Sequence, residues 1–108
     1  MEKIKKNYGL KHWIRAKKVI PTGNSLLSKN PNLYHPDKWP TYYKRAKGCE
    51  VVSLDNIKYT DVSMMGVGTN ILGYSYKPVD DAVRKVIKNG NMSTLNPPEE
   101  VYLSEELL

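Results

Sequence analysis

The chain has 108 residues, a length that suits one small domain with a thin hydrophobic core. Hydrophobic residues make up 40% and charged residues 26% of it, a balance typical of globular proteins and unlike that of disordered ones. The single cysteine, Cys49, excludes a scaffold stapled by internal disulfides, and no apolar run reaches the roughly 20 residues that a membrane-spanning helix needs. We therefore expect a cytoplasmic protein without a membrane partner.

The net charge of +6 is distributed unevenly. Residues 1–50 contain 12 lysines and arginines against 3 acidic residues, whereas residues 51–108 contain 5 against 8. A basic half with interleaved tyrosines is compatible with a small module that binds single-stranded nucleic acid. The cations are scattered and do not follow one face, so we favour a solvated surface and keep nucleic-acid binding as the alternative.

The first predicted helix covers residues 7–19. Leu10, Trp13 and Ile14 have the spacing of one helix face, and lysines and arginines occupy much of the opposite face. Pro21 ends this helix because the residue before a proline avoids the helical conformation.

Residues 21–41 are rich in Pro, Gly, Asn and Ser and predict a long loop, of the kind that is functional or covers another surface. Residues 42–63 contain three short runs rich in Tyr, Val, Ile and Thr, which predict a three-stranded antiparallel meander. The turns are expected at residues 47–48 and at residues 55–56, where Asp and Asn both tolerate the positive φ of a two-residue hairpin turn.

Residues 64–77 contain three glycines and predict an irregular segment. A helix follows between Pro78, which suits the first helical position, and Gly90, which suits the position after the end. Five apolar residues keep the helical repeat without a miss: Val79, Ala82, Val83, Val86 and Ile87. Two aspartates in the first turn are expected to pair with basic residues four positions later: Asp80 with Arg84, and Asp81 with Lys85.

The last predicted helix begins at Asn96, which can cap it, with Pro97 in the first position and Glu99 completing a capping-box pattern. The apolar pattern runs on to Leu107 and Leu108 with no Gly, Asn or Pro to close it. We expect from this unclosed apolar end that the chain is a fragment of a longer protein.

The sequence contains few candidates for a metal site, a nucleophile or an anion-binding loop. His12, His35 and Cys49 lie far apart, and none has a second ligand at a zinc-like spacing, so we expect no metal site. Cys49 is interpreted as a small apolar strand residue rather than a nucleophile. The loop Gly66–Thr69 follows a strand, so its backbone amides would suit an anion, but it lacks the third glycine of the dinucleotide fingerprint. Its spacing favours a turn or a close backbone approach instead.

Four segments occur in a characteristic order: AKKVIPTGNS (16–25), VSLDNIKYTD (52–61), NILGYSYKP (70–78) and NPPEEVYLSEEL (96–107). In this order they resemble the N-terminal segment of the class III (fold-type I) pyridoxal-phosphate aminotransferases, nearest the glutamate-1-semialdehyde aminomutase branch. The corresponding family patterns are A-x-x-x-I-P-G-G-x-N-S, W-D-V-D-G-N-E-Y-I-D, I-L-G-H-x-H-P and P-x-E-x-E-L-A-E-x-L. The resemblance covers nearly the whole chain.

The resemblance implies an α+β fold that forms the N-terminal part of a PLP-transferase. Residues 1–63 would supply the N-terminal helix, loop and meander of the small domain, and residues 64–108 the connecting loop and first helices leading into the large domain. It also implies an aminotransferase (transaminase) or aminomutase (isomerase) that acts on a small amino- or keto-bearing molecule as a homodimer. Pyridoxal 5'-phosphate would be its cofactor. The Schiff-base lysine lies downstream of the matched segment in this family, so we expect this chain alone to hold no cofactor and to be inactive.

The resemblance also suggests which residues lie near the substrate and cofactor. Asn24 and Ser25 match the family's N-S, which approaches the substrate side of the active site. The family's cleft-lining loop after the meander corresponds to Gly66, Val67, Gly68 and Thr69. Residues 28–29 are Ser-Lys where aminomutases carry an arginine, so the resemblance leaves an amino sugar or another amino compound open as the substrate.

Overall fold

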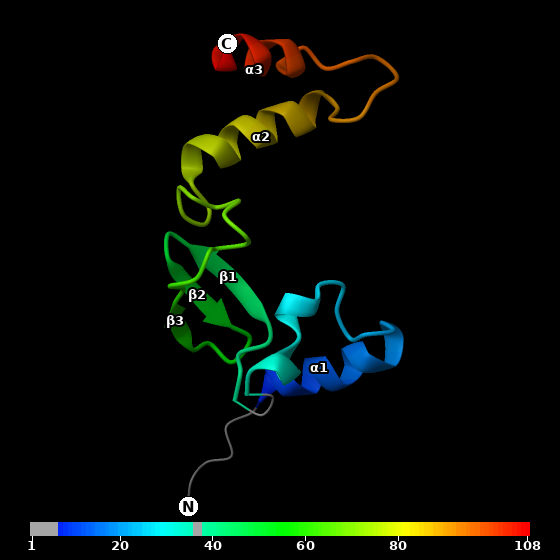
Figure 1. Ribbon diagram of the computed structural model, residues 1–108, viewed down its shortest axis with the longest axis vertical. Coiled ribbons are helices and arrows are strands. Elements are labelled where there is room, and N and C mark those ends of the chain that lie inside the picture. Colours follow the sequence, from blue (N-terminus) through cyan, green and yellow to red (C-terminus); the bar gives the residue numbers. More distant parts are fainter. Residues whose placement is uncertain (1–6, 36–37) are drawn as a thin grey trace, which may run out of the picture. The chain divides into compact units, whose positions relative to one another are not determined.

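The computed structural model describes residues 7–35 and 38–108, and the chain divides into two compact units, one up to Tyr74 and one from Ser75 to Leu108. The first unit contains helix α1 (Tyr8–Val19), two short 3-10 helices, η1 (Leu27–Lys29) and η2 (Pro31–Leu33), and three strands, β1 (Tyr43–Lys47), β2 (Glu50–Ser53) and β3 (Lys58–Thr60) (Figure 1). The second contains the helices α2 (Lys77–Asn89) and α3 (Glu99–Leu107). The fold class is α+β, as predicted.

The N-terminus of α1 is tied to the sheet by one carboxylate. Asn7 caps the helix, its side-chain oxygen accepting a hydrogen bond from the amide of Leu10 (2.8 Å). Asp55, in the turn between β2 and β3, accepts hydrogen bonds from the amides of Tyr8 (2.7 Å) and Gly9 (3.4 Å). These amides have no acceptor within the helix, and the helix dipole favours a negative charge there, so Asp55 fixes the helix on the hairpin.

The core of the first unit is thin. Trp13, Ala16 and Val52 are its buried hydrophobic residues in the described part of the chain, whereas Ile14 of the predicted apolar face is 46% exposed and Val19, at the end of the helix, is 80% exposed. The predicted helix is therefore confirmed, but only the Trp13 side of its apolar face is covered.

The three strands form the predicted antiparallel meander in the order β1-β2-β3. Both expected turns differ in detail. Cys49 is exposed in the turn that joins β1 to β2, so the prediction that it is a strand residue is wrong. The second turn covers residues 54–57, not two residues, and Asn56 has its positive φ (64°). Buried Ser53 sets this longer turn, because its hydroxyl accepts hydrogen bonds from the amides at both ends, Asp55 (3.2 Å) and Ile57 (3.3 Å).

The predicted loop at residues 21–41 contains the helices η1 and η2, so it is more ordered than the Pro- and Asn-rich composition indicated. Asn30 separates the two helices, and its side chain accepts a hydrogen bond from the amide of Asn32 (3.0 Å). Pro31 is fully buried. Asn and Pro favour tight turns, and here each of two tight turns forms a single turn of 3-10 helix.

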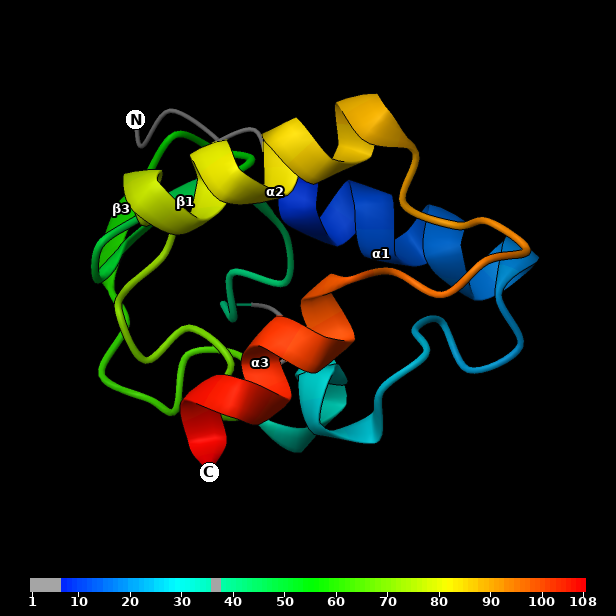
Figure 2. The ribbon, with the colours of Figure 1, turned by 90° about the horizontal axis from the view of Figure 1, so that it is seen from above.

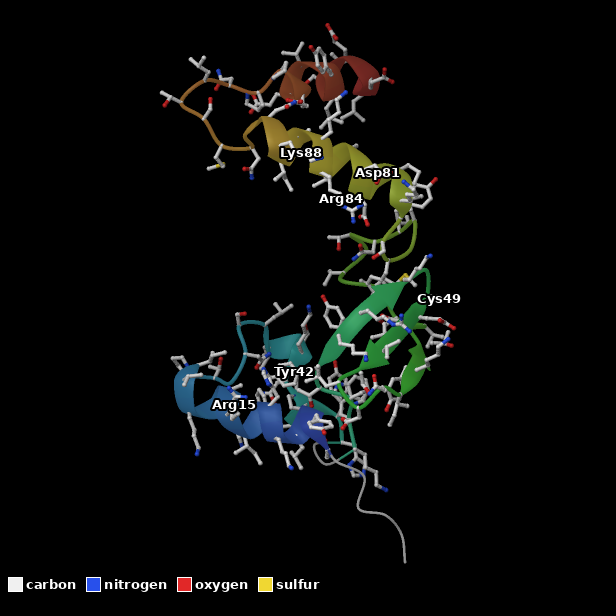
Figure 3. The ribbon with its side chains drawn as sticks, turned by 180° about the vertical axis from the view of Figure 1, so that it is seen from behind. Arg15, Tyr42, Cys49, Asp81, Arg84 and Lys88 are labelled. Atoms are coloured by element: carbon white, nitrogen blue, oxygen red, sulfur yellow. The ribbon has the colours of Figure 1, made fainter. Side chains whose placement is uncertain are left out.

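In the second unit, α2 forms where the periodicity predicted it and ends at Gly90, whose φ is +90°. Asp81 pairs with Lys77 and with Arg84 (3.3 Å), in place of the two predicted pairs, and Figure 3 shows Asp81 and Arg84 on this helix. The start of α3 was predicted wrongly. Pro98 precedes the first helical residue, Glu99, without any side-chain cap, so Asn96 does not cap the helix.

The apolar residues of α2 and α3 are exposed, and Leu107 and Leu108 with them. No helix within residues 7–35 and 38–108 combines the length and the apolar character needed to cross a bilayer. The predicted division at residues 63 and 64 into small-domain and large-domain parts rests on the family resemblance and stays a prediction.

Replacing Gly23 by alanine should destabilise the first unit. Gly23 is buried with φ +80°, and a Cβ there would overlap the indole ring of Trp13. We expect the free energy of unfolding to fall by about 1–3 kcal/mol, measured by urea denaturation followed by far-ultraviolet circular dichroism. Gly68→Ala is the matched control, since Gly68 has the same φ but no atom near its Cβ position. An equal loss in both variants would contradict the overlap with Trp13.

Candidate functional site

The residues predicted to lie near the substrate form two groups in the first unit. Asn24 and Ser25 lie in the turn that follows α1, and Gly66–Thr69 lie in the loop that follows β3. Figures 1 and 2 show these as separate segments, and no hydrogen bond joins them within the described residues. The structure therefore does not bring the two groups together within this chain.

The turn after α1 is shaped by its own side chains. The hydroxyl of Thr22 donates a hydrogen bond to the carbonyl of Asn24, and the side-chain amide of Asn24 donates one to the carbonyl of Leu26. Ser25 is exposed and its hydroxyl makes no hydrogen bond within the described residues. Asn24 thus holds the turn, and Ser25 presents a hydroxyl to solvent.

The loop after β3 contains a left-handed turn. Four consecutive residues have positive φ angles: Met65 (41°), Gly66 (73°), Val67 (61°) and Gly68 (80°). The amide of Gly68 donates to the carbonyl of Met64 (2.5 Å), which closes the turn. L-residues normally enter this conformation singly, and a β-branched residue such as Val67 is a clear outlier there.

Two polar side chains support the turn from the next positions. The hydroxyl of Thr69 donates a hydrogen bond to the carbonyl of Gly66 (2.7 Å), and the amide of Asn70 donates one to the carbonyl of Met65 (3.2 Å). Glycine suits position 66, because its φ is +73° and a Cβ there would make a tight contact, 3.0 Å, with the Thr69 hydroxyl. Thr69 therefore holds the loop with its hydroxyl, and Val67, within the turn, is 70% exposed.

Tyr74 closes the base of this loop. Its amide and carbonyl exchange two hydrogen bonds of 2.8 Å with Gly48 in the β1–β2 turn, and its hydroxyl donates to Asp61 at the end of β3 (2.6 Å). Asp61 also accepts hydrogen bonds from the hydroxyl (2.6 Å) and the amide (2.9 Å) of Ser63. Gly73 is needed beside the bridge, since it has φ +90° and a Cβ there would lie 3.2 Å from the Cα of Gly48.

These contacts shift two pKa values in opposite directions. The hydrogen bond from the Ser63 hydroxyl, followed by that from Tyr74, lowers the pKa of Asp61 because both stabilise the carboxylate. The hydrogen bond to Asp61 raises the pKa of Tyr74 to about 12 because it stabilises the neutral phenol. Sequence reasoning missed both residues as site residues, although Asp61 ends the matched segment VSLDNIKYTD and Tyr74 stands at the family's His in I-L-G-H.

A cavity of about 690 Å³ lies between the start of α1 and the sheet, with Tyr8, Trp39, Tyr42 and Tyr59 among its lining residues. Tyr42, labelled in Figure 3, also packs edge-to-face on His12 (4.6 Å between ring centroids), and burial raises its pKa. The aromatic lining was not predicted from the sequence as a site, because these tyrosines are scattered along the chain.

The chemistry available within the described part of the chain is limited. No group of three or more His, Cys, Asp or Glu side chains there could hold a metal ion. Every lysine in residues 7–35 and 38–108 is exposed, whereas a Schiff-base lysine needs a desolvated environment. These residues by themselves do not fit a pyridoxal-phosphate pocket.

Comparison with known proteins identifies three relatives of this chain. It is 32% identical over 88 residues to 3-aminobutyryl-CoA aminotransferase of Cloacimonas acidaminovorans, a match to 82% of this chain and 21% of the relative. It is 30% identical over 94 residues to glutamate-1-semialdehyde 2,1-aminomutase of Methylacidiphilum infernorum (87% and 21%). It is 32% identical over 86 residues to diaminobutyrate–2-oxoglutarate aminotransferase of Haemophilus influenzae (77% and 18%).

All three relatives are class III aminotransferase enzymes. This chain is related to that family. It spans about a fifth of the length of the curated relatives it matches, which fits an N-terminal segment of a class III aminotransferase. No protein-family model and no solved structure matches the chain. The assignment of Asn24, Ser25 and Gly66–Thr69 to the substrate side of such an enzyme stays a prediction.

The hydrogen bond between Tyr74 and Asp61 predicts that Tyr74 ionises at a higher pH than an ordinary tyrosine. Tyr74 should lose its proton near pH 12, against about 10 for an ordinary tyrosine, in a titration followed by phenolate absorbance. Asp61→Asn should lower the pKa of Tyr74 toward that of an ordinary tyrosine, because the carboxylate that stabilises the neutral phenol is gone. Tyr76→Phe, at an exposed neighbouring tyrosine, should leave the pKa of Tyr74 unchanged. A single ionisation phase in the unaltered chain would contradict the assignment.

The hydrogen bond between Tyr74 and Asp61 stabilises the fold over a limited pH range. Tyr74 has a raised pKa, so its contribution is complete below about pH 10 and is lost as the pH rises through about 12. Asp61 has a lowered pKa, so its contribution is present above the ordinary pKa of aspartate and is lost as the pH falls through the lowered value.

Proposed function

We propose that this chain is the N-terminal segment of a pyridoxal-phosphate-dependent aminotransferase or aminomutase that acts on a small molecule bearing an amino or keto group. The observation that carries the proposal is the extent of the matches. They cover 77 to 87% of this chain but 18 to 21% of each relative. A segment of a larger enzyme of this family would produce this asymmetry.

The exposed apolar surface supports the same proposal. On α2, Val79, Val83 and Ile87 are 49%, 50% and 56% exposed although they share one helix face. Such a stripe normally lies against a protein core, because leaving it in water forfeits about 25 cal/mol for each Å² of apolar surface. We propose that in the complete enzyme this face of α2 packs against the protein core.

We infer that the cofactor-binding lysine belongs to the part of the enzyme outside this sequence. The described lysines are all exposed, whereas a Schiff-base lysine is held in desolvated surroundings. When bound, pyridoxal phosphate supplies the electron sink for amino-group chemistry. This chain would contribute the walls that orient a substrate, and would be inactive alone. A homodimeric, cytoplasmic parent enzyme is part of the proposal.

The substrate is proposed only as a class. The three relatives are named for three different amino compounds, so the comparisons support no single one. Lys29, at the end of η1, stands with Ser28 where aminomutases of the resembled branch carry an arginine, which argues against the semialdehyde. Ser25 is the exposed hydroxyl that we propose for contact with a substrate carboxylate.

The chain alone should form no lasting adduct with pyridoxal phosphate. Exposed lysines form only weak imines, which dissociate when the free cofactor is removed. After mixing and gel filtration, we expect no imine absorbance band in the protein fraction, whereas a complete pyridoxal-phosphate aminotransferase treated alike retains its band. A band that stays with this chain would overturn the placement of the Schiff-base lysine outside it.

The gene should encode more than this chain. From the coverage of the relatives we expect one polypeptide about four times as long. Sequencing of the gene and its transcript, with an immunoblot of source cells using antibodies against this chain, measures that length. A stable cellular product of 108 residues and no longer product would refute the proposal.

A further inference from the structure

The loop from Val62 to Gly73 differs from the rest of the chain in composition. It contains no charged side chain, although 26% of all residues are charged. Its apolar side chains are largely exposed: Val62 (92%), Met64 (68%), Val67 (70%), Ile71 (88%) and Leu72 (63%). Its two larger polar side chains, Thr69 and Asn70, are already used in hydrogen bonds within the loop. The surface that the loop offers to a ligand is therefore uncharged and mainly apolar.

The conformation of the loop needs support from outside the turn. Four consecutive positive φ angles, one of them at Val67, form a strained arrangement that persists only where the surroundings over-determine it. Thr69 and Asn70 support the turn from one side, but both belong to the same loop and move with it. A fixed position relative to the sheet requires a contact at the base.

Tyr74 provides that contact through three hydrogen bonds to two other elements. Its backbone bridges to Gly48 tie the end of the loop to the β1–β2 turn, and its hydroxyl ties it to Asp61, where the loop begins. The bond to Asp61 is short (2.6 Å) and charge-assisted, so it is the strongest of the three. It holds the two ends of the Val62–Gly73 segment together, so that the segment forms a closed loop.

We propose that Tyr74 is a positioning residue: by bonding to Asp61 and Gly48 together, it closes the 62–73 loop and holds the left-handed turn at Met65–Gly68 in one conformation, ready to contact an uncharged part of the substrate. The contact with substrate rests on the proposed function, whereas the closure of the loop does not. Tyrosine is required because phenylalanine would keep the ring and the backbone bridge but lose the bond to Asp61.

Amide hydrogen exchange in this chain, resolved by NMR, tests the closure. The reporter is the amide of Gly68, which donates to Met64 inside the turn. In Tyr74→Phe and in Asp61→Asn its exchange should become about tenfold faster, the factor expected for loss of one charge-assisted hydrogen bond. Tyr76→Phe is the matched control, and should leave the exchange unchanged.

A second reporter separates loosening of the loop from general unfolding. The amide of Tyr8 bonds to Asp55 on a different part of the first unit, so its exchange should stay the same in all three variants. Faster exchange at Gly68 with unchanged exchange at Tyr8 supports the proposal. Unchanged exchange at Gly68, or equal acceleration at both amides, overturns it.

Kinetics of the complete enzyme test the contact with substrate. Tyr74→Phe should raise KM for the amino substrate several-fold while kcat changes less, because the variant loosens a binding wall and touches no reacting group. An unchanged KM in an active enzyme whose loop has loosened overturns the substrate contact. If the complete polypeptide has no aminotransferase activity even without substitution, the proposed function fails, and the exchange experiment still decides the closure.

Discussion

The carboxylate of Asp55 is the interaction on which the first unit depends. Helix α1 covers little apolar surface, and its first amides need acceptors that the helix itself does not provide. Asp55 supplies two acceptor oxygens from the β2–β3 turn, and Ser53, buried beneath that turn, sets the turn that carries them. The hydrogen bonds from the first amides of α1 to Asp55 thus fix the helix on the hairpin. In a larger domain, packing of apolar side chains in the core would do this. The His12–Tyr42 ring contact adds a second, weaker link between α1 and the segment that leads into the sheet.

Elements whose signal is repeated along the sequence were predicted well. The apolar repeat of α2, bounded by Pro78 and Gly90, gave the correct helix because five residues agree on one period. Features that depend on one side chain were predicted less well. Asn96 has the right identity for a cap but the helix begins three residues later, after Pro98. Cys49 has the right size for a strand, yet the turn that Gly48 permits takes it out of the ladder.

The candidate site shows the same limit. The loop at residues 66–69 was found from its glycines and from the family resemblance, which matches the order of elements. Its left-handed conformation could not be found in that way, because Val67 disfavours it and only the contacts of the folded chain impose it. The hydrogen bond between Asp61 and Tyr74 joins residues 13 positions apart, and no local sequence pattern predicts it.

The exposed thiol of Cys49 has a practical consequence. It is the chain's one cysteine, it lies next to Gly48, and Figure 3 shows it at the tip of the β1–β2 hairpin. A thiol-reactive fluorophore or spin label would therefore attach at a single known place. That place adjoins the backbone bridge between Gly48 and Tyr74. The attached probe would therefore report opening and closing of the 62–73 loop without any engineered residue.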